Sequence, residues 1–189
     1  MRAAFICHGI HGIRINVVPA GDMCGRNTRP DTGSAVSLTL GVVPACVFTD
    51  EIQTPAETTA DAVRAQYEAT LADVIETVGS DAVAAHADID ADTVAALAAG
   101  DSPTLTVTEA ADILAASDDY PPADTLQAEL QDHVMLQMSS AVLDVDALAR
   151  GLDGDHDAKP LQQKLEGRQP MTLAEYARIH RYVAAQNPY

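Results

Sequence analysis

Apolar residues recur at intervals of three and four positions through most of the chain after residue 54. This is the spacing of one face of an α-helix. The first such face ends at Gly79, and its members are Val63, Tyr67, Leu71, Val74, Ile75 and Val78. Thr54, Pro55 and Glu57 precede it in the pattern of a capping box with proline at the first helical position. The sequence therefore predicts a long helix at the start of this region.

Shorter helices are predicted next. Ser80 is placed to cap a helix over residues 81–87, and Asp90 to cap another that ends at Gly100. Residues 88–90 form a three-residue turn between these two helices.

The stretch over residues 81–113 is repeated over residues 146–179. The matched pairs are Gly100 with Gly167, Pro103 with Pro170, Thr106 with Thr172, Glu109 with Glu175, and Ile113 with Ile179. Both copies thus contain a Thr/Glu capping box before a last helix. A second long apolar face precedes the second copy, with members Leu126, Leu130, Val134, Met138, Ala141 and Val142, and either Asp144 or Asp146 opens the short helix that follows. Because a repeat determines the architecture, we expect an all-α fold in which one helical unit is built twice.

The Pro-rich stretch at residues 118–122 separates the two copies. It divides the folded part into a first unit, 47–120, and a second unit, 121–189. Residues 1–46 differ from both because they contain all three cysteines and only two acidic residues. We expect them to be a poorly ordered N-terminal extension, or an artefact of start assignment if translation begins at Val47.

Two other interpretations of residues 1–46 stay open. Cys7, His8, His11 and Cys24 could hold a metal ion, although their spacing matches no standard zinc motif. The run 43–46 ends in cysteine like a lipoprotein cleavage box, but the apolar stretch before it is short and broken. Neither pattern is specific enough to replace the expectation above.

The charge of the chain is strongly negative. There are 28 acidic side chains against 11 lysines and arginines, which gives a net charge of −17. The first 47 residues carry a net charge of +2, residues 48–149 carry −20, and residues 150–189 carry six cations against five carboxylates.

A strongly acidic surface suits a protein that works in concentrated salt, where charge repulsion is screened. The alternative is that the acidic residues mimic nucleic acid or gather cations, but they are scattered rather than consecutive. The positive charge of the second copy indicates where an anionic partner would bind.

The order of long helix, short helix, turn and helix resembles the Cro/repressor type of helix-turn-helix domain. The residues that carry this resemblance are Ala84, Ile89, Val94, Leu97 and Gly100 in the first copy, and Ala149, Leu161 and residues 166–170 in the second. Residues 55–185 also resemble acidic haloarchaeal proteins of unknown function. The turn position usually filled by glycine is Asp88 in one copy and Asp153 in the other, and the second turn has two extra residues. Lys164 stands where Leu97 stands in the first copy.

The resemblance implies a tandem helix-turn-helix-like helical bundle, in which the third helix of each unit would enter the major groove of DNA. In the first copy its outward residues are Ala91, Asp92, Ala95, Ala96 and Ala99, which suit helix packing rather than base contacts. In the second copy they are Lys159, Gln162, Gln163, Lys164 and Arg168, with Arg178 and Arg181 on the next helix. We therefore expect a transcription-regulator-like protein that binds duplex DNA through its second unit.

The alternative is a non-enzymatic protein–protein interaction module or homodimer. A continuous positive patch over Lys159, Lys164 and Arg168 would favour DNA, and a broken patch would favour the interaction module.

Other function classes find little support in the sequence. There is no Gly-rich phosphate loop, no nucleophile elbow and no paired His and carboxylate at metal spacing after residue 46. We expect no enzymatic activity, no cofactor and no metal site in the folded part. No segment reaches the roughly 20 apolar residues of a membrane span. We expect a cytoplasmic protein.

Overall fold

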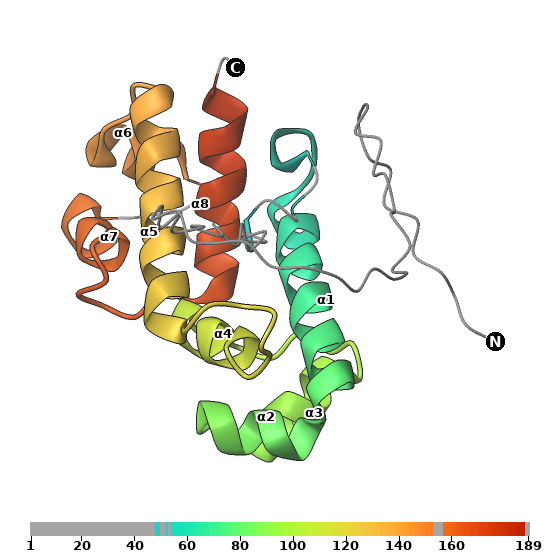
Figure 1. Cartoon of the computed structure of the whole chain (residues 1–189). Helices are drawn as coiled ribbons and strands as arrows, with labels where there is room; N and C mark the ends of the chain where they lie inside the picture. Colours follow the sequence, from blue (N-terminus) through green and yellow to red (C-terminus); the bar gives the residue numbers. More distant parts are fainter. Residues whose placement is uncertain (1–47, 50–51, 53, 153–156, 188–189) are drawn as a thin grey trace, which may run out of the picture. The chain divides into compact units, whose positions relative to one another are not determined.

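The computed structural model describes residues 48–49, 52, 54–152 and 157–187, which all belong to one compact unit (Figure 1). Regular structure in these residues is helical apart from one isolated β-bridge. The all-α prediction is confirmed. The predictions for residues 1–46, with the metal, lipoprotein and start-site alternatives, lie outside the described residues. So do the second-copy turn residues Asp153 and His156.

The first half of the described unit contains a short 3-10 helix, η1, and four α-helices. Their bounds are Pro55–Glu57 for η1, Ala60–Val78 for α1, Ser80–Ala87 for α2, Ala91–Ala98 for α3 and Val107–Leu114 for α4. The second half contains α5 (Ala123–Ser140), α6 (Val145–Gly151), α7 (Ala158–Leu165) and α8 (Leu173–Gln186). Each predicted helix corresponds to one of these. Long α1 and α5 are each followed by two short helices and a capped last helix.

Two predicted helix starts are wrong. Thr54 has a left-handed backbone, with φ at 45°, and its side chain makes no capping hydrogen bond. The residues after it form only η1, and α1 begins at Ala60 because the Thr59 hydroxyl accepts the Ala62 N–H at 3.1 Å. Ser80 is the first residue of α2 rather than its cap. Gly79, at φ 100°, is both the C-cap of α1 and the N-cap of α2, so no separate capping residue lies between the two helices.

The other predicted caps are confirmed. Asp90 accepts the Asp92 N–H at 2.8 Å, and Asp144, rather than Asp146, caps α6. Both capping boxes are complete in α4 and α8, where the threonine hydroxyl and the glutamate carboxylate each accept a hydrogen bond from the other residue's backbone N–H. These boxes fix where the last helix of each copy begins.

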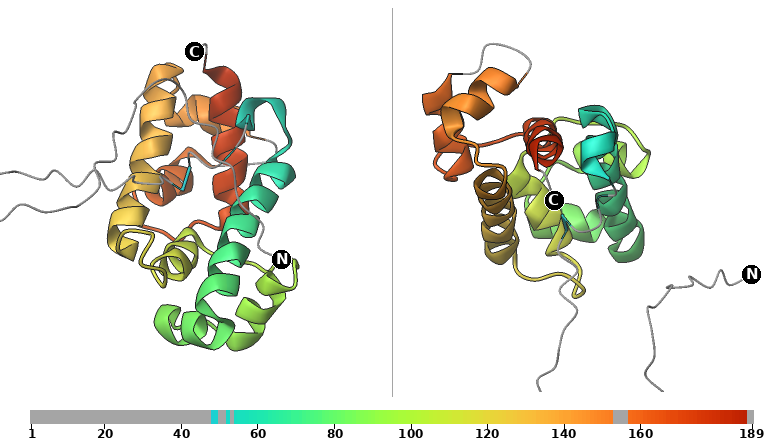
Figure 2. Two further views of the ribbon diagram at one scale, coloured as in Figure 1. Left: turned by 45° about the vertical axis from the view of Figure 1, so that its right-hand side comes forward. Right: turned by 90° about the horizontal axis from the view of Figure 1, so that it is seen from above.

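The two copies share one core instead of packing as separate halves. The long helix of each copy packs against the last helix of the other, α1 against α8 and α5 against α4 (Figure 2). Thr106 and Thr172, which are matched positions of the repeat, form an antiparallel bridge. Its hydrogen bonds run from Val107 N–H to the Met171 carbonyl at 2.9 Å and from Leu173 N–H to the Leu105 carbonyl at 2.8 Å. Reciprocal contacts between equivalent residues are those of a two-fold-related pair.

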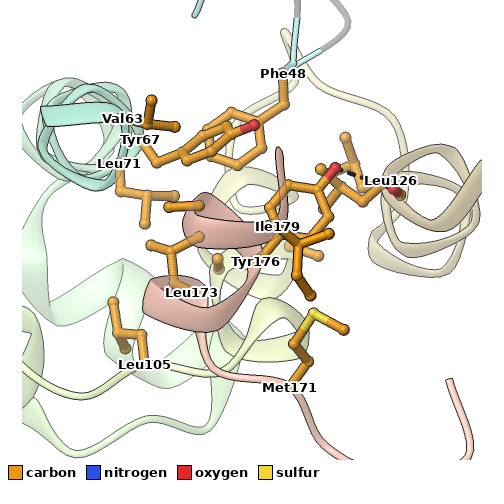
Figure 3. Close-up of a cluster of buried hydrophobic side chains, with 14 of the residues drawn as sticks. Phe48, Val63, Tyr67, Leu71, Leu105, Leu126, Met171, Leu173, Tyr176 and Ile179 are labelled. Carbon is orange, nitrogen blue, oxygen red and sulfur yellow. Dashed lines mark hydrogen bonds between the residues drawn. The ribbon is translucent and has the colours of Figure 1, made fainter. Parts of the chain in front are cut away.

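Aromatic and small residues fill the centre of this core. Tyr67 is fully buried on α1, with the Phe48 ring 4.7 Å away and the Tyr176 ring at 5.8 Å (Figure 3). The Tyr176 hydroxyl donates to the Leu130 carbonyl at 3.0 Å, which links α8 to α5. The alanines Ala110, Ala111 and Ala177 have no exposed surface. Their small size lets α4 and α8 approach their neighbours closely.

Candidate functional site

The surface of α7 carries the residues that the sequence nominates for DNA contact. Lys159 and Gln162 are exposed on this helix. The Gln162 amide donates to Glu166 Oε1 at 2.9 Å. Gln162 is thus hydrogen-bonded to the carboxylate at the C-terminal end of α7. Lys159 is the cation of this set for which the structure shows no ion pair with another described residue.

Lys164 is held by α8 and does not extend from α7 into solvent. Its ammonium group pairs with Glu175 Oε1, while Glu175 Oε2 accepts from the backbone N–H and hydroxyl of Thr172. Partial burial of Glu175 tends to raise its pKa, but Lys164 and the two Thr172 donors outweigh this and lower the pKa below its ordinary value. The carboxylate of the second capping box therefore also anchors α7. In the first copy the position of Lys164 is occupied by the apolar Leu97. In the second copy Lys164 forms this ion pair, and the neighbouring Leu165 is buried instead.

Arg168 lies just beyond α7 with about 64% of its side chain exposed, and its guanidinium pairs with Glu166. The chain turns here through Gly167, whose φ is 69°, a conformation that glycine adopts without strain. The Gln163 carbonyl accepts the N–H groups of Arg168 and Gln169, and the Gln163 and Gln169 side chains are hydrogen-bonded at 2.6 Å. Two carboxylates, those of Glu166 and Glu175, thus lie against the cations Arg168 and Lys164.

A cleft of about 240 Å³ lies beside this turn, between α5, α7 and the segment that leads into α8. Its apolar lining consists of Val107, Leu130, Val134, Leu165, Pro170, Met171 and Tyr176. Its polar lining consists of Thr108, Gln127, Gln131, Lys164, Arg168 and Gln169. Three neutral amides therefore share the rim with two cations that are each paired with a glutamate. Sequence reasoning missed the α5 contribution, because Gln127 and Gln131 look like ordinary solvent-facing helix positions.

Arg178 and Arg181 lie apart from the cleft. Both line a separate pocket of about 350 Å³ that also includes Tyr182 and the start of α1. Arg181 donates to the Thr58 carbonyl at 3.2 Å. Arg178 reaches back toward α7, because it lines a small recess with Lys164 and Glu175. Arg178 and Arg181 therefore line a different pocket from the one that Arg168 lines, and Arg178 comes near the cleft only through Lys164.

The corresponding face of the first copy is nearly bare of polar groups. Ala91, Asp92, Ala95 and Ala99 are exposed and Ala96 is half-buried. No described helix covers the exposed alanines. In agreement with the sequence prediction, this face offers no donor for a phosphate or a base edge.

A chain of polar side chains crosses the core between α1, α8 and α5. The Tyr67 hydroxyl lies 2.7 Å from His180 Nδ1, and His180 Nε2 lies 3.3 Å from His133 Nε2. His180 is only 3% exposed, and burial, together with nearby His133, lowers its pKa to about 4. Burial likewise raises the pKa of Tyr67 well above its usual value. The two histidines are 47 residues apart in sequence, so no local spacing could have indicated that they meet.

These helices correspond to a known sequence family. The model of a family of unknown function, DUF5791, matches residues 63–186. The chain belongs to this family. The matched DUF5791 segment begins within α1 and ends with α8, so it includes both copies of the repeat and most of their shared core, although the core residues Phe48 and Ile52 precede it. No curated protein and no solved structure matches the chain.

Two kinds of feature are absent from the residues that the structure describes. Within the described residues, no three side chains of the His, Cys, Asp and Glu types come together as a group that could hold a metal ion. In the same part of the chain, no helix combines the length and the apolar character needed to cross a membrane.

Proposed function

We propose that this protein is a non-enzymatic interaction module that binds a neutral segment of a partner protein in the cleft between α5 and α7. The observation that carries the proposal is the pairing of both cleft cations, Lys164 with Glu175 and Arg168 with Glu166. A surface whose cations are neutralised within the protein gains little from phosphate, since most nucleic-acid affinity is electrostatic.

The lining of the cleft supports the same partner chemistry. Its floor is apolar, from Leu130, Met171 and Tyr176, and would take an aliphatic or aromatic side chain. The amides of Gln127 and Gln131 at the rim can each donate and accept, which matches a peptide backbone. A neutral peptide with one apolar anchor fits these groups better than a polyanion does.

Site-specific photo-crosslinking tests this proposal. A photoreactive residue at Gln131, on the cleft, should yield a discrete protein adduct in cells of the native host, and one at exposed Asp73 on α1 should not. The change Thr108→Trp, which places a large ring at the cleft rim, should abolish the adduct. If the adduct forms equally from both positions, or survives Thr108→Trp, the cleft is not the binding site.

Duplex DNA is a second candidate partner, favoured by three observations. Six of the seven cationic side chains in the described residues come from the second half, and Lys159 and Gln162 are exposed on α7. The first half also keeps the tight turn expected of a helix-turn-helix unit, since Asp88 adopts a left-handed conformation with φ at 52° between α2 and α3. In this proposal α7 would serve as the reading helix.

Fluorescence anisotropy with labelled duplex DNA separates the two candidates. The interaction module predicts no measurable DNA affinity and no effect of Lys159→Glu. The DNA proposal predicts an affinity that falls steeply with salt and is weakened by Lys159→Glu, with Arg64→Gln as a control far from α7. A salt-dependent affinity that Lys159→Glu reduces would replace the first proposal with the second.

We also infer that the protein works in concentrated salt. The support is the net charge of −17, with acidic residues spread along the described helices rather than gathered in one run. Such a surface is self-repulsive in dilute buffer and is screened in molar salt.

A further inference from the structure

His133 of α5 and His180 of α8 face each other through the same ring atom. Their Nε2 atoms are 3.3 Å apart, and their rings are nearly perpendicular, at 84°. Two nitrogen ligands that each lie about 2.0–2.1 Å from one tetrahedral ion are separated by about 3.3 Å. We propose that these two Nε2 atoms bind a divalent transition-metal ion of the class that imidazole favours, such as Zn²⁺, Ni²⁺ or Cu²⁺.

Tyr67 supports the ligand role of His180 from the other side of the ring. A metal-bound histidine almost always has a hydrogen-bond partner on its second nitrogen, which fixes the orientation of the ring. The Tyr67 hydroxyl, 2.7 Å from His180 Nδ1, occupies this position. Tyr67 is itself fully buried against Phe48, so the partner of His180 Nδ1 is a close-packed core residue.

Metal binding requires a change of tautomer that this cluster can accommodate. Without an ion, a hydrogen bond between the two Nε2 atoms needs a proton on one of them, and His180 Nδ1 can then accept from the Tyr67 hydroxyl. With an ion, both Nε2 lone pairs are used, so the His180 proton lies on Nδ1 and is donated to the Tyr67 oxygen. The Tyr67 hydroxyl proton can then turn toward the hydroxyl of neighbouring Tyr176. Both imidazoles stay neutral and no proton has to leave the core.

The two histidines differ in exposure. His180 is buried and His133 is half-buried on α5, so an ion would have to reach the pair from the side of His133. Since the described residues provide no third ligand of the usual types, water or an external ligand would complete the coordination. The net charge of −17 raises the local concentration of cations around the protein.

Isothermal titration of the full chain with Zn²⁺ tests the proposal. Wild type should bind one more ion than His133→Gln, and Tyr67→Phe should bind that ion about 10–100-fold more weakly. His86→Gln, which removes an exposed histidine of α2, is the matched control and should behave as wild type. Any binding by the cysteines and histidines of residues 1–46 is common to all four proteins and cancels in the comparison.

Histidine ¹⁵N NMR of the wild-type chain gives a second measurement that does not depend on a variant. Zn²⁺ should shift the Nε2 resonances of both His133 and His180 and move the His180 proton to Nδ1. Equal Zn²⁺ stoichiometry and affinity in wild type and His133→Gln would overturn the proposal. So would Nε2 resonances that do not respond to Zn²⁺.

Discussion

Val142 occupies a backbone conformation that suits glycine. It follows α5 with φ at 54°, and the hydrogen bonds from Val142 and Leu143 to the Ser139 and Met138 carbonyls form a Schellman motif. A β-branched residue in the left-handed region is strained by about 1–2 kcal/mol, and this side chain is 91% exposed, so it gains no packing in return. We expect Val142→Gly to raise the free energy of unfolding by about 1 kcal/mol. Urea denaturation followed by circular dichroism measures the change.

Gly100 provides the control for this prediction. It ends α3 in the same motif, with φ at 85°, and a β-carbon at this position would meet no atom within 4 Å. Gly100→Val should therefore destabilise the protein through backbone strain alone. If Val142→Gly left stability unchanged while Gly100→Val lowered it, the strain at Val142 would be relieved by a contact of its side chain.

Helix starts could be predicted from the sequence where the capping residues lie within one turn of each other. The Thr/Glu boxes at Thr106 and Thr172 are recognisable because both partners lie within one turn. The predicted caps Thr54 and Ser80 were wrong because another residue nearby caps the helix in each case. Thr59 caps α1, and Gly79 occupies the N-cap position of α2. Competition between neighbouring caps depends on the backbone path, which local sequence does not specify.

At the scale of the element, an ion pair joins α7 to α8, in addition to the packing of the buried Leu161 and Leu165. Glu175 caps α8 with one carboxylate oxygen and holds Lys164 with the other. We expect Glu175→Gln to lower the free energy of unfolding at neutral pH by about 1 kcal/mol, since it weakens both contacts. Glu109→Gln is the matched control, because Glu109 forms the same capping box and has no cation partner in the described residues. The Glu175 change should be the larger of the two in thermal denaturation.

The effect of Glu175 depends on pH in a defined direction. Its pKa in the folded protein is lower than the ordinary value of 4.5. The carboxylate therefore contributes stability above pH 4.5, and the contribution is lost as the pH falls through the folded-state pKa. Wild type and Glu175→Gln should differ in stability at pH 7, and the difference should shrink as the pH falls below 4.5 and through the folded-state pKa. A difference that persisted unchanged at low pH would contradict the assignment.

The candidate site was only partly predictable from sequence. Lys159, Gln162, Gln163, Lys164 and Arg168 are correctly placed on or just after the predicted third helix of the second copy. The sequence could not show that Lys164 pairs with a residue 11 positions later, or that α5 forms the other wall of the cleft. Both facts follow from how α5, α7 and α8 meet, which involves contacts between separate elements.

At the scale of the whole molecule, net charge should govern stability in dilute buffer. Repulsion among the carboxylates acts over about 10 Å at 0.1 M salt and about 3 Å at 1 M. We expect the melting temperature to rise between these concentrations of KCl, and to rise less in the triple variant Asp73→Asn, Glu76→Gln, Asp132→Asn, which removes three exposed charges. Differential scanning calorimetry measures both. Equal salt dependence in the two proteins would show that the effect is not electrostatic.

The interleaving of the two copies leads to the last prediction. The buried face of α5 is covered in part by α4, and that of α8 by α1, so residues 121–189 alone would expose Leu130, Tyr176 and Val183. Exposure of a core on this scale outweighs the marginal stability of a small helical domain. We expect the fragment 121–189 to be largely unfolded by circular dichroism, and to regain helix when mixed with the fragment 48–120. If the fragment 121–189 instead folded by itself, its NMR resonances would be dispersed. The second copy would then be an autonomous domain that does not need the shared core to fold.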